Sequence, residues 1–434
     1  MGMKYSEYKS SEVEWIGMIP KHWKIEKLGY HISILSGFPF KSELFDPFEG
    51  FPILRIRDIT SGKCETFYKG EYDKSQIVSN NDLLVGMDGD FTLRWWENGD
   101  VLLNQRCCCL KTNNTLLKRF LFYFLPENLK IVNDLTYFTT VKHLSNDDIK
   151  RIKISLPPLP EQEEIVKYLD DKTFQIDNLI SLTEKKIELL KQKRTSLINE
   201  VITRGLDPKV ELKDSGIEWI GEIPKHWDKD RIKYIGFMYG GLTGKSGDDF
   251  RKDEDDPTNR HFIPFTNICN NTYIDKNDLK LVSINEKDNQ NIVKKGDIFF
   301  MMTSENQEDL GKTSILKDDL GEVYLNTFCK GFRIKNKSVN PYFLNYLLNS
   351  NPYRVILSIE GNGFTRINLR QDRVSDFVVF TPPQSEQEEI VKYLDTHTTE
   401  IDNLISIEQR RIETLKEYRQ SMISEVITGK LNVN

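Results

Sequence analysis

The stretch that decides the fold of this chain is PPLPEQEEIVKYLDDKTFQIDNLISLTEKKIELLKQKRTSLINEVITRGL, residues 157–206, because the sequence contains it twice. Residues 382–431 repeat it at an offset of 225, with 31 of 50 positions identical. A second block, EWIGMIPKHW at residues 14–23, returns as EWIGEIPKHW at residues 218–227, an offset of 204. Repetition at this level identifies a tandem duplication.

The material between the repeated blocks has diverged. Residues 24–156 and 228–381 share only faint echoes, such as FPILRIRDI beside HFIPFTNI and VLLNQRCCCL beside VYLNTFCKGF. The second insert is 225 − 204 = 21 residues longer than the first. A retained frame around two altered inserts indicates one scaffold that presents two different surfaces.

The repeated blocks predict helices. Glu161 and Glu386 follow prolines and open acidic first turns, which favour a helix N-terminus, and a short helix is expected to end at about Asp170 and Asp395. A longer helix is expected at residues 174–203, about 45 Å long at 1.5 Å per residue. Its heptad seam and the counterpart seam of the second repeat comprise Ile176, Ile180, Thr183, Ile187, Leu190, Arg194, Leu197 and Val201, and Ile401, Ile405, Glu408, Ile412, Leu415, Arg419, Met422 and Val426.

A duplicated chain with an internal two-fold axis predicts that the two long helices form an antiparallel coiled coil. One register that suits the charges pairs Ile176 with Val426 and Arg194 with Glu408, and it places Thr183 beside Arg419. The alternative is that each helix only caps its neighbouring domain.

The two inserts predict mixed α/β domains. Runs rich in β-forming residues and bounded by Gly, Asp or Asn predict strands, and two later runs predict short helices. The strands are expected at residues 51–56, 82–87, 101–110, 298–302 and 323–334, and the helices at 116–125 and 342–348. The fold class is therefore α+β, and we expect recognition domains at 1–156 and 207–381 with repeated helical regions at 157–206 and 382–434.

Composition is typical of a globular cytoplasmic protein: 38% of residues are hydrophobic, and no apolar run reaches the ~20 residues of a membrane helix. The six cysteines fit neither a disulfide framework nor a metal site, which indicates reduced thiols. On a strand, Cys107 and Cys109 would face one side and Cys108 the other.

The net charge of −6 does not by itself suggest a nucleic-acid partner. The acid is unevenly distributed, because residues 1–156 carry 21 basic and 20 acidic side chains whereas residues 382–434 carry 6 and 10. A basic surface on the inserts therefore remains compatible with the composition.

Sequences that resemble catalytic motifs lack the residue spacing that those motifs require. GKS at residues 244–246 resembles the end of a phosphate-binding loop, but Tyr239 stands where the first glycine is needed. The proline pairs lie in LPPL and TPPQ rather than in a methyltransferase motif, DPKVELK lacks nuclease spacing, and the six histidines are scattered. No catalytic residue, metal ligand or bound cofactor is predicted.

The chain resembles the specificity subunits of type I restriction-modification systems in the order of its motifs, which occurs twice. That order is WIGxIPKHW, a variable insert, PPxxEQEEIVKYLD, IDNLIS and EVIT. The resemblance covers essentially the whole chain. It implies a non-catalytic subunit whose two variable domains each bind half of a split double-stranded DNA target, with half-sites roughly 13 base pairs apart for helices of ~45 Å. It also implies two methylation subunits and restriction subunits as partners, to which S-adenosylmethionine, ATP and Mg belong.

Base reading requires side chains that donate or accept paired hydrogen bonds. The candidates in the first insert are Lys41, Arg55, Arg57, Asp88, Arg94, Trp95, Asn104, Gln105 and Arg106. Those in the second insert are Lys245, Thr266, Asn267, Thr303, Ser304, Lys312, Asn326, Thr327, Arg366 and Asn368.

Two alternatives remain open. Trp95 and Trp96, beside Arg94, form either a wedge against the bases or part of a buried core. The whole chain is either a DNA reader or a symmetric protein adaptor that gathers partners through its coiled coil without binding DNA.

Overall fold

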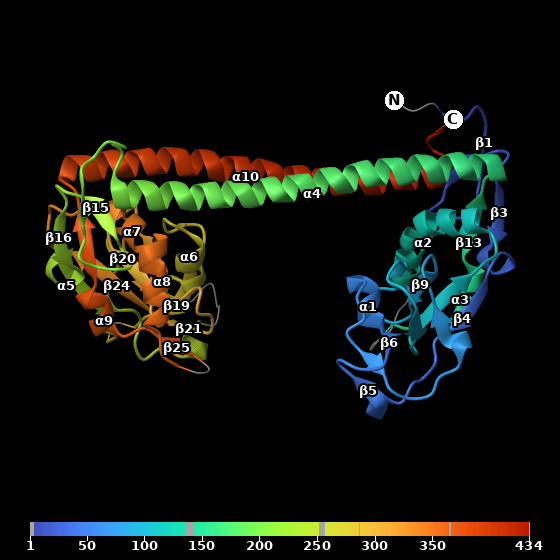
Figure 1. Ribbon diagram of the computed structural model, residues 1–434, viewed down its shortest axis with the longest axis horizontal. Helices are drawn as coiled ribbons and strands as arrows, with labels where there is room; N and C mark the ends of the chain where they lie inside the picture. The colour runs from blue at the N-terminus through green and yellow to red at the C-terminus, as the bar shows by residue number, and fades with distance from the viewer. Residues whose placement is uncertain (1–3, 136–141, 251–256, 286, 364–365, 434) are drawn as a thin grey trace. The chain divides into compact units, whose positions relative to one another are not determined.

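A computed structural model describes residues 4–135, 142–250, 257–285, 287–363 and 366–433. The chain forms two compact units (Figure 1): unit 1 comprises residues 1–184 and 410–434, and unit 2 comprises residues 185–409. Each unit contains one insert and a segment of both long helices, α4 (Leu159–Arg204) and α10 (Gln384–Ile427). Among the helices described, none has the length and apolar character to cross a membrane.

Unit 1 is built on two sheets, two strand pairs and three helices of its own. The four-stranded sheet has the order β10 (Leu93–Trp95), β9 (Leu83–Gly86), β12 (Cys107–Lys111), β4 (Ser33–Ser36). The five-stranded sheet has the order β5 (Phe45–Asp46), β7 (Phe67–Tyr68), β6 (Phe51–Leu54), β11 (Val101–Leu103), β8 (Ile77–Val78). The pairs are β1 (Tyr8–Ser10) with β2 (Met18–Pro20) and β3 (Lys24–Lys27) with β13 (Lys153–Leu156). The helices are α1 (Ile56–Ser61), α2 (Thr115–Leu135) and α3 (Asn146–Arg151), with the 3-10 turn η1 (Leu28–Tyr30).

Unit 2 repeats this plan with a different periphery. Its four-stranded sheet has the order β17 (Gly236–Gly240), β24 (Cys329–Ile334), β20 (Ile298–Met301), β22 (Thr313–Ile315). Its three-stranded sheet has the order β19 (Lys280–Ser283), β18 (Asn259–Ile263), β23 (Val323–Leu325). The pairs are β14 (Leu212–Asp214) with β15 (Glu222–Pro224), β16 (Asp228–Arg231) with β26 (Val378–Thr381), and β21 (Thr303–Ser304) with β25 (Ile367–Asn368). The helices are α5 (Ile232–Ile235), α6 (Phe265–Asn270), α7 (Pro341–Leu348), α8 (Asn351–Ile359) and α9 (Gln371–Asp376).

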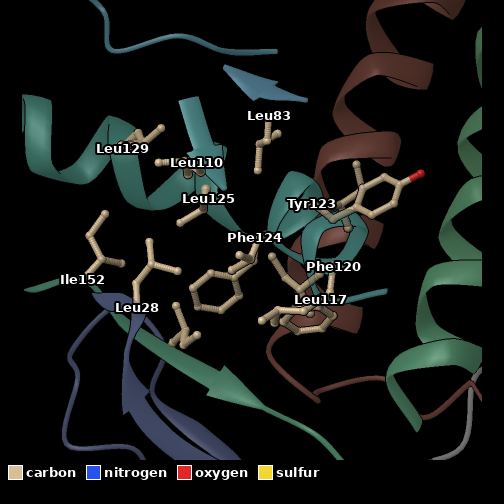
Figure 2. Packing of buried hydrophobic residues seen from close by; sticks show 14 of the residues in the cluster. Leu28, Leu83, Leu110, Leu117, Phe120, Tyr123, Phe124, Leu125, Leu129 and Ile152 are labelled. Carbon is tan, nitrogen blue, oxygen red and sulfur yellow. The ribbon is translucent and has the colours of Figure 1, made fainter. Parts of the chain in front are cut away.

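The core of unit 1 lies between α2, the four-stranded sheet and the long helices. Figure 2 shows Phe124 and Leu125 of α2 packed among the same buried side chains as Leu28 and Ile152. The triple cysteine divides between two cores as predicted, since Cys108 joins this cluster while its two neighbours face the cluster around Trp96. Alternation along a strand produces this division.

The long helices pack together, and their burial follows the expected seam. Every seam position is buried or half buried, and the residue on each side of most of them is exposed. Within unit 1 Arg419 of α10 pairs with Asp177 of α4, at 3.0 Å between Nε and Oδ1. Within unit 2 Lys186 pairs with Glu408, and Arg194 Nε lies 2.9 Å from Asp402 Oδ1. Partners on α10 move backward as α4 advances, so the helices run antiparallel.

The expected charge pairing was wrong. Arg194 contacts Asp402, which lies 408 − 402 = 6 residues before the expected partner, and Glu408 is bound by Lys186 instead. A heptad pattern repeats every seven residues and therefore fits several registers. Flanking residues outside the apolar seam, including Asp402 and Lys186, form the ion pairs in the register that the structure adopts.

Several element boundaries also differ from expectation. The helix expected at 116–125 continues to Leu135 as α2. The short and long helices of each repeat are a single helix, 46 residues in α4, because no glycine or proline interrupts it after the first turn. The strand expected at 51–56 ends at Leu54, where Asp58 accepts the Arg55 backbone N–H at 2.9 Å and begins α1. The strands expected at 101–110 and 323–334 are each two strands separated by a turn, 104–106 and 326–328.

Candidate nucleic-acid interface

A glutamate at the start of each long helix, buried in unit 1 and partly exposed in unit 2, holds the repeated PKHW motif. In unit 1 Glu161 accepts hydrogen bonds from Trp23 Nε1 at 3.0 Å and from His22 Nε2 at 2.8 Å. In unit 2 Glu386 binds the Trp and His of the second PKHW at 3.2 and 2.7 Å. We call this contact the clasp. The clasp explains why PKHW and the start of the long helix are both repeated in the two halves, since each supplies one side of the same polar contact.

A second carboxylate, two to three turns along each helix, ties the helix to its domain. Asp170 of α4 binds the hydroxyl of Tyr123 and the guanidinium of Arg119, at 2.8 Å to Nη2. Asp395 of α10 binds the hydroxyls of Tyr346, at 2.8 Å, and Tyr273. Each domain is thus attached at two points to the helix that follows it, once through the PKHW motif and once through its insert.

Three segments meet at one edge of the four-stranded sheet in each unit. In unit 1 the Met87 backbone N–H donates to Arg106 O at 2.8 Å, and its carbonyl accepts from Leu144 N at 2.7 Å. In unit 2 the same two bonds join Met302 to Phe328, at 3.1 Å, and to Leu369, at 2.8 Å. The two units therefore share one backbone hydrogen-bond pattern at this place, although their side chains differ. It joins the end of β9 or β20 to the turn between two strands and to the loop before α3 or α9.

In unit 1 these segments bring together Asp88, Arg106 and His143, which we call the first tip cluster. His143 Nδ1 lies 2.7 Å from Asp88 Oδ1, and Arg106 Nη1 lies 3.2 Å from Asp88 Oδ2. Arg106 occupies the turn with φ of 72° and has an exposed side chain. With Gln105 and Asn146 the cluster borders a cavity of about 320 Å³. The guanidinium is oriented by one carboxylate and otherwise open to solvent.

The second tip cluster comprises Thr303, Phe328, Arg366 and Asn368. Thr303 Oγ1 donates to Asn368 Oδ1 at 2.7 Å, and the Arg366 guanidinium lies 5.2 Å from the centre of the Phe328 ring. A cavity of about 420 Å³ lies beside Thr303, Phe328 and Arg366 and is also bordered by Ser304. This cluster offers an amide and a stacked guanidinium where the first offers an arginine held by an acid.

Several candidate readers are placed inside the domains. Arg94 Nη1 donates to the carbonyls of Ile59 and Thr60 at 2.8 and 2.9 Å, at the end of α1. Lys245 leaves only 4% of its side chain exposed and pairs with Asp288. Asn267, Asn104 and Asn326 are buried, and Lys312 pairs with Asp309 at 2.6 Å. These polar groups already have partners within the fold.

The two tryptophans belong to packing. Trp96 is fully buried and its Nε1 donates to Gly99 O at 2.6 Å. Trp95 is partly covered, with the Arg119 guanidinium 4.8 Å from its ring and Phe122 at 6.0 Å. Burial, rather than a wedge, is the alternative that the structure supports.

The remaining candidates are exposed or half exposed, and two of them, Gln105 and Thr327, lie in the turns 104–106 and 326–328. Arg55 lies 5.8 Å from the Phe45 ring, and Arg57 Nη2 donates to Thr66 at 3.2 Å. The exposed or half-exposed members of this group are Lys41, Arg55, Arg57, Gln105, Thr266 and Thr327.

Sequence reasoning missed His143, which had been grouped with the scattered histidines. The signal was present: HLSND at residues 143–147 aligns with NLRQD at 368–372 at the offset of 225 that relates the long helices. The alignment places His143 opposite Asn368, and the structure gives both the same backbone position. Among the described residues no group of three or more His, Cys, Asp or Glu side chains could hold a metal ion.

Comparison with known proteins agrees with this architecture. The family described as the type I restriction modification DNA specificity domain matches residues 20–192 and 227–417. The chain is 28% identical over 418 residues to the type I restriction enzyme EcoBI specificity subunit of Escherichia coli, covering 92% of this chain and 84% of the relative. It is 26% identical to the MjaVIII specificity subunit of Methanocaldococcus jannaschii, covering 99% and 97%.

Solved structures share the fold. A chain from a study of complex assembly and conformational transition of the type I R-M system matches with a TM-score of 0.68 at 15% identity, covering 94% of this chain and 98% of that one. The HsdS subunit from Thermoanaerobacter tengcongensis matches with a TM-score of 0.51 at 15% identity, covering 95% and 98%. Subunits of the matched family are non-catalytic and carry no cofactor of their own. With two matched domains spanning most of its length, the chain belongs to the family of type I restriction-modification DNA specificity subunits.

Proposed function

We propose that the domains at residues 1–156 and 207–381 each read one half of a split DNA target, and that the two tip clusters make the base contacts. The observation that carries this proposal is a contrast at equivalent positions. The clasp keeps the same residue types in both halves, whereas the turn residue changes from Arg106 to Phe328 and the loop residue from His143 to Asn368. Sequence reading requires such differences, and attachment to a helix does not.

The chemistry of the first tip cluster suits guanine. An arginine presents two parallel N–H donors that match the guanine O6 and N7 acceptors in the major groove. Asp88 holds Arg106 by one Nη1 contact at 3.2 Å and leaves its other donors available. An oriented guanidinium loses less conformational freedom on binding than a free one. Asp88 and, through it, His143 therefore act as positioning residues for Arg106.

The chemistry of the second tip cluster suits a different half-site. Asn368 carries an amide, the group that pairs with adenine N6 and N7, and its side chain is exposed. Thr303 fixes its orientation through the 2.7 Å bond to Oδ1. Arg366, stacked on Phe328, supplies a further donor at the same edge.

We infer that two methylation subunits dock on the paired helices and that restriction subunits complete a cytoplasmic complex. The duplicated clasps support two equivalent docking places, because each is built from the same residue types. S-adenosylmethionine, ATP and Mg would be held by those partner subunits.

The test uses the subunit assembled with its methylation subunits and a pool of random duplex DNA. Wild type should enrich a split motif. Arg106→Lys, which keeps the charge but loses the fork, should relax one base position of one half-site by about 1–3 kcal/mol, roughly 5- to 150-fold. Asn368→Ala should relax a position of the other half-site only. Relaxation of both halves by either variant, or no enrichment by wild type, would refute the assignment.

A further inference from the structure

Each half presents one exposed tyrosine at the same place in its fold. Tyr30 ends η1 with 76% of its surface exposed, and Tyr234, at an offset of 204, lies in α5 with 68% exposed. This tyrosine is the only identical position between residues 24–36 and 228–240. The buried position two residues earlier changes from Leu to Ile. Packing does not explain why the exposed ring is the retained one, whereas a contact outside the chain does.

In unit 1 the tyrosine lies beside an excess of positive charge. Lys9, Lys27 and Lys153 border, with Tyr30, a groove of about 960 Å³, and all three lysines are exposed. Lys27 and Lys153 lie directly opposite each other on β3 and β13, an arrangement that is destabilising for like charges. Within the described ranges neither lysine has an acidic partner at ion-pair distance. We call these four residues the tyrosine groove.

The acidic side chains of the groove do not cancel this charge. Two glutamates, Glu12 and Glu26, line the groove with the three lysines, and Glu26 is engaged by His31, at 2.7 Å to Nε2. In unit 2 Arg231 takes the place of Lys27. Lys233 Nζ lies 5.4 Å from the centre of the Tyr234 ring, whereas Lys213, at the place of Lys9, donates to the Trp227 carbonyl at 2.8 Å. There Arg231 and Lys233 share one carboxylate, that of Asp376, at 3.6 and 2.7 Å. Both halves therefore place surplus cations next to the tyrosine.

A short helix joins the tyrosine to the tip cluster in each unit. The first turn of α3 borders the first tip cavity through Asn146, and beyond its last turn Ile152 O accepts the backbone N–H of Leu28 at 2.8 Å. In unit 2 Phe377 O, just after α9, accepts from Ile232 N at 3.1 Å. Six helical residues span about 9 Å, which corresponds to the rise of between two and three base pairs at about 3.4 Å each along the duplex axis.

We propose that the tyrosine groove and its counterpart around Tyr234 bind backbone phosphates of duplex DNA next to the bases read by each tip cluster. The inference rests on the proposed function and deepens it. The tyrosine hydroxyl donates to a phosphate oxygen, and Lys27 or Arg231 supplies the charge. Phosphates carry no sequence information, so one contact serves both half-sites, and its residues stay alike while the readers differ.

The experiment measures binding of the assembled complex to its selected duplex and to a scrambled duplex over a range of salt concentrations. Tyr30→Phe and Tyr234→Phe should each weaken binding to both duplexes by the same factor, roughly tenfold or more, because each removes one hydrogen bond to a charged oxygen. The logarithm of the association constant falls linearly with the logarithm of the salt concentration, and Lys27→Ala should make that slope less steep by about 0.9. Arg106→Lys, the matched reader variant, should instead lower the ratio between selected and scrambled duplex.

Four outcomes would overturn the inference. Three of them are unchanged affinities for both duplexes in the tyrosine variants, a loss confined to the selected duplex in those variants, and an unchanged salt dependence in Lys27→Ala. Weaker assembly with the methylation subunits at unchanged DNA affinity would assign the groove to a protein partner. A wild-type complex that enriches no split motif would defeat the proposed function, while its affinity for scrambled duplex would still report on the phosphate contact.

Discussion

The clasps and the tip clusters are built from comparable polar groups, and they differ in what surrounds them. Glu161 is 7% exposed and its contacts reach the fully buried Trp23, whereas Arg106 stands on an exposed turn. The clasp uses its carboxylate entirely within the chain, and the tip presents donors to solvent. Of these two features, the duplication keeps the contact that is used within the chain and varies the one that is presented to solvent.

The largest expected effect is on the clasp. Glu161→Ala should lower the free energy of unfolding by about 2–4 kcal/mol, because it leaves the buried Trp23 N–H without an acceptor. Denaturant unfolding followed by tryptophan fluorescence measures the loss. Glu163→Ala, on an exposed face of the same helix, is the control and should change stability by less than about 0.5 kcal/mol. Equal losses from both variants would show that the clasp is not a stabilising contact.

The next effect concerns which half of the target responds. Exchange of residues 24–156 for those of another specificity subunit should replace one half-site and leave the other intact, since each tip cluster lies within one insert. Selection of bound sequences from random DNA by the assembled complex measures the sequence of each half-site. A change in both half-sites would contradict the division into two independent readers.

A smaller effect separates two ion pairs between the long helices. Lys186→Met should cost about 1–2 kcal/mol, because it removes an ion-pair partner of Glu408, which is 5% exposed. Arg194→Met breaks a pair whose acid, Asp402, is half exposed, and it should cost less than about 1 kcal/mol. Thermal unfolding of the two variants under the same conditions compares them, and the reverse order would overturn the ranking.

The smallest effect tests whether β12, the strand that follows the turn of the first tip cluster, stays closed in the native protein. Burial raises the pKa of the Cys107 and Cys109 thiols to about 12, so both remain neutral at pH 8 and react slowly with alkylating reagents. Mass spectrometry should find these residues unlabelled in native protein and labelled after denaturation. Rapid labelling under native conditions would show that the strand opens.

Part of the site could be predicted from the sequence. The offset of 225 that aligns the long helices also aligns His143 with Asn368, and turn residues such as Arg106 and Gln105 were among the candidates. Arg94 and Lys245 were equally plausible by residue type, yet the fold turns them toward carbonyls and carboxylates of their own domains. Residue type and spacing do not tell a solvent-facing donor from one that has an internal partner.

The sequence by itself determined the duplication, the paired helices, the mixed α/β inserts and the family, because these depend on repeats, periodicity and long shared motifs that are local or linear in the chain. Only the tertiary structure decided the register of the helices, the partners of Glu161 and Asp170, and the meeting of Asp88, Arg106 and His143. Those contacts join residues far apart in the chain, Asp88 and His143 being 55 positions apart, and they are selected by packing geometry rather than by pattern. A heptad fits several registers and an arginine fits many surroundings until the fold selects one.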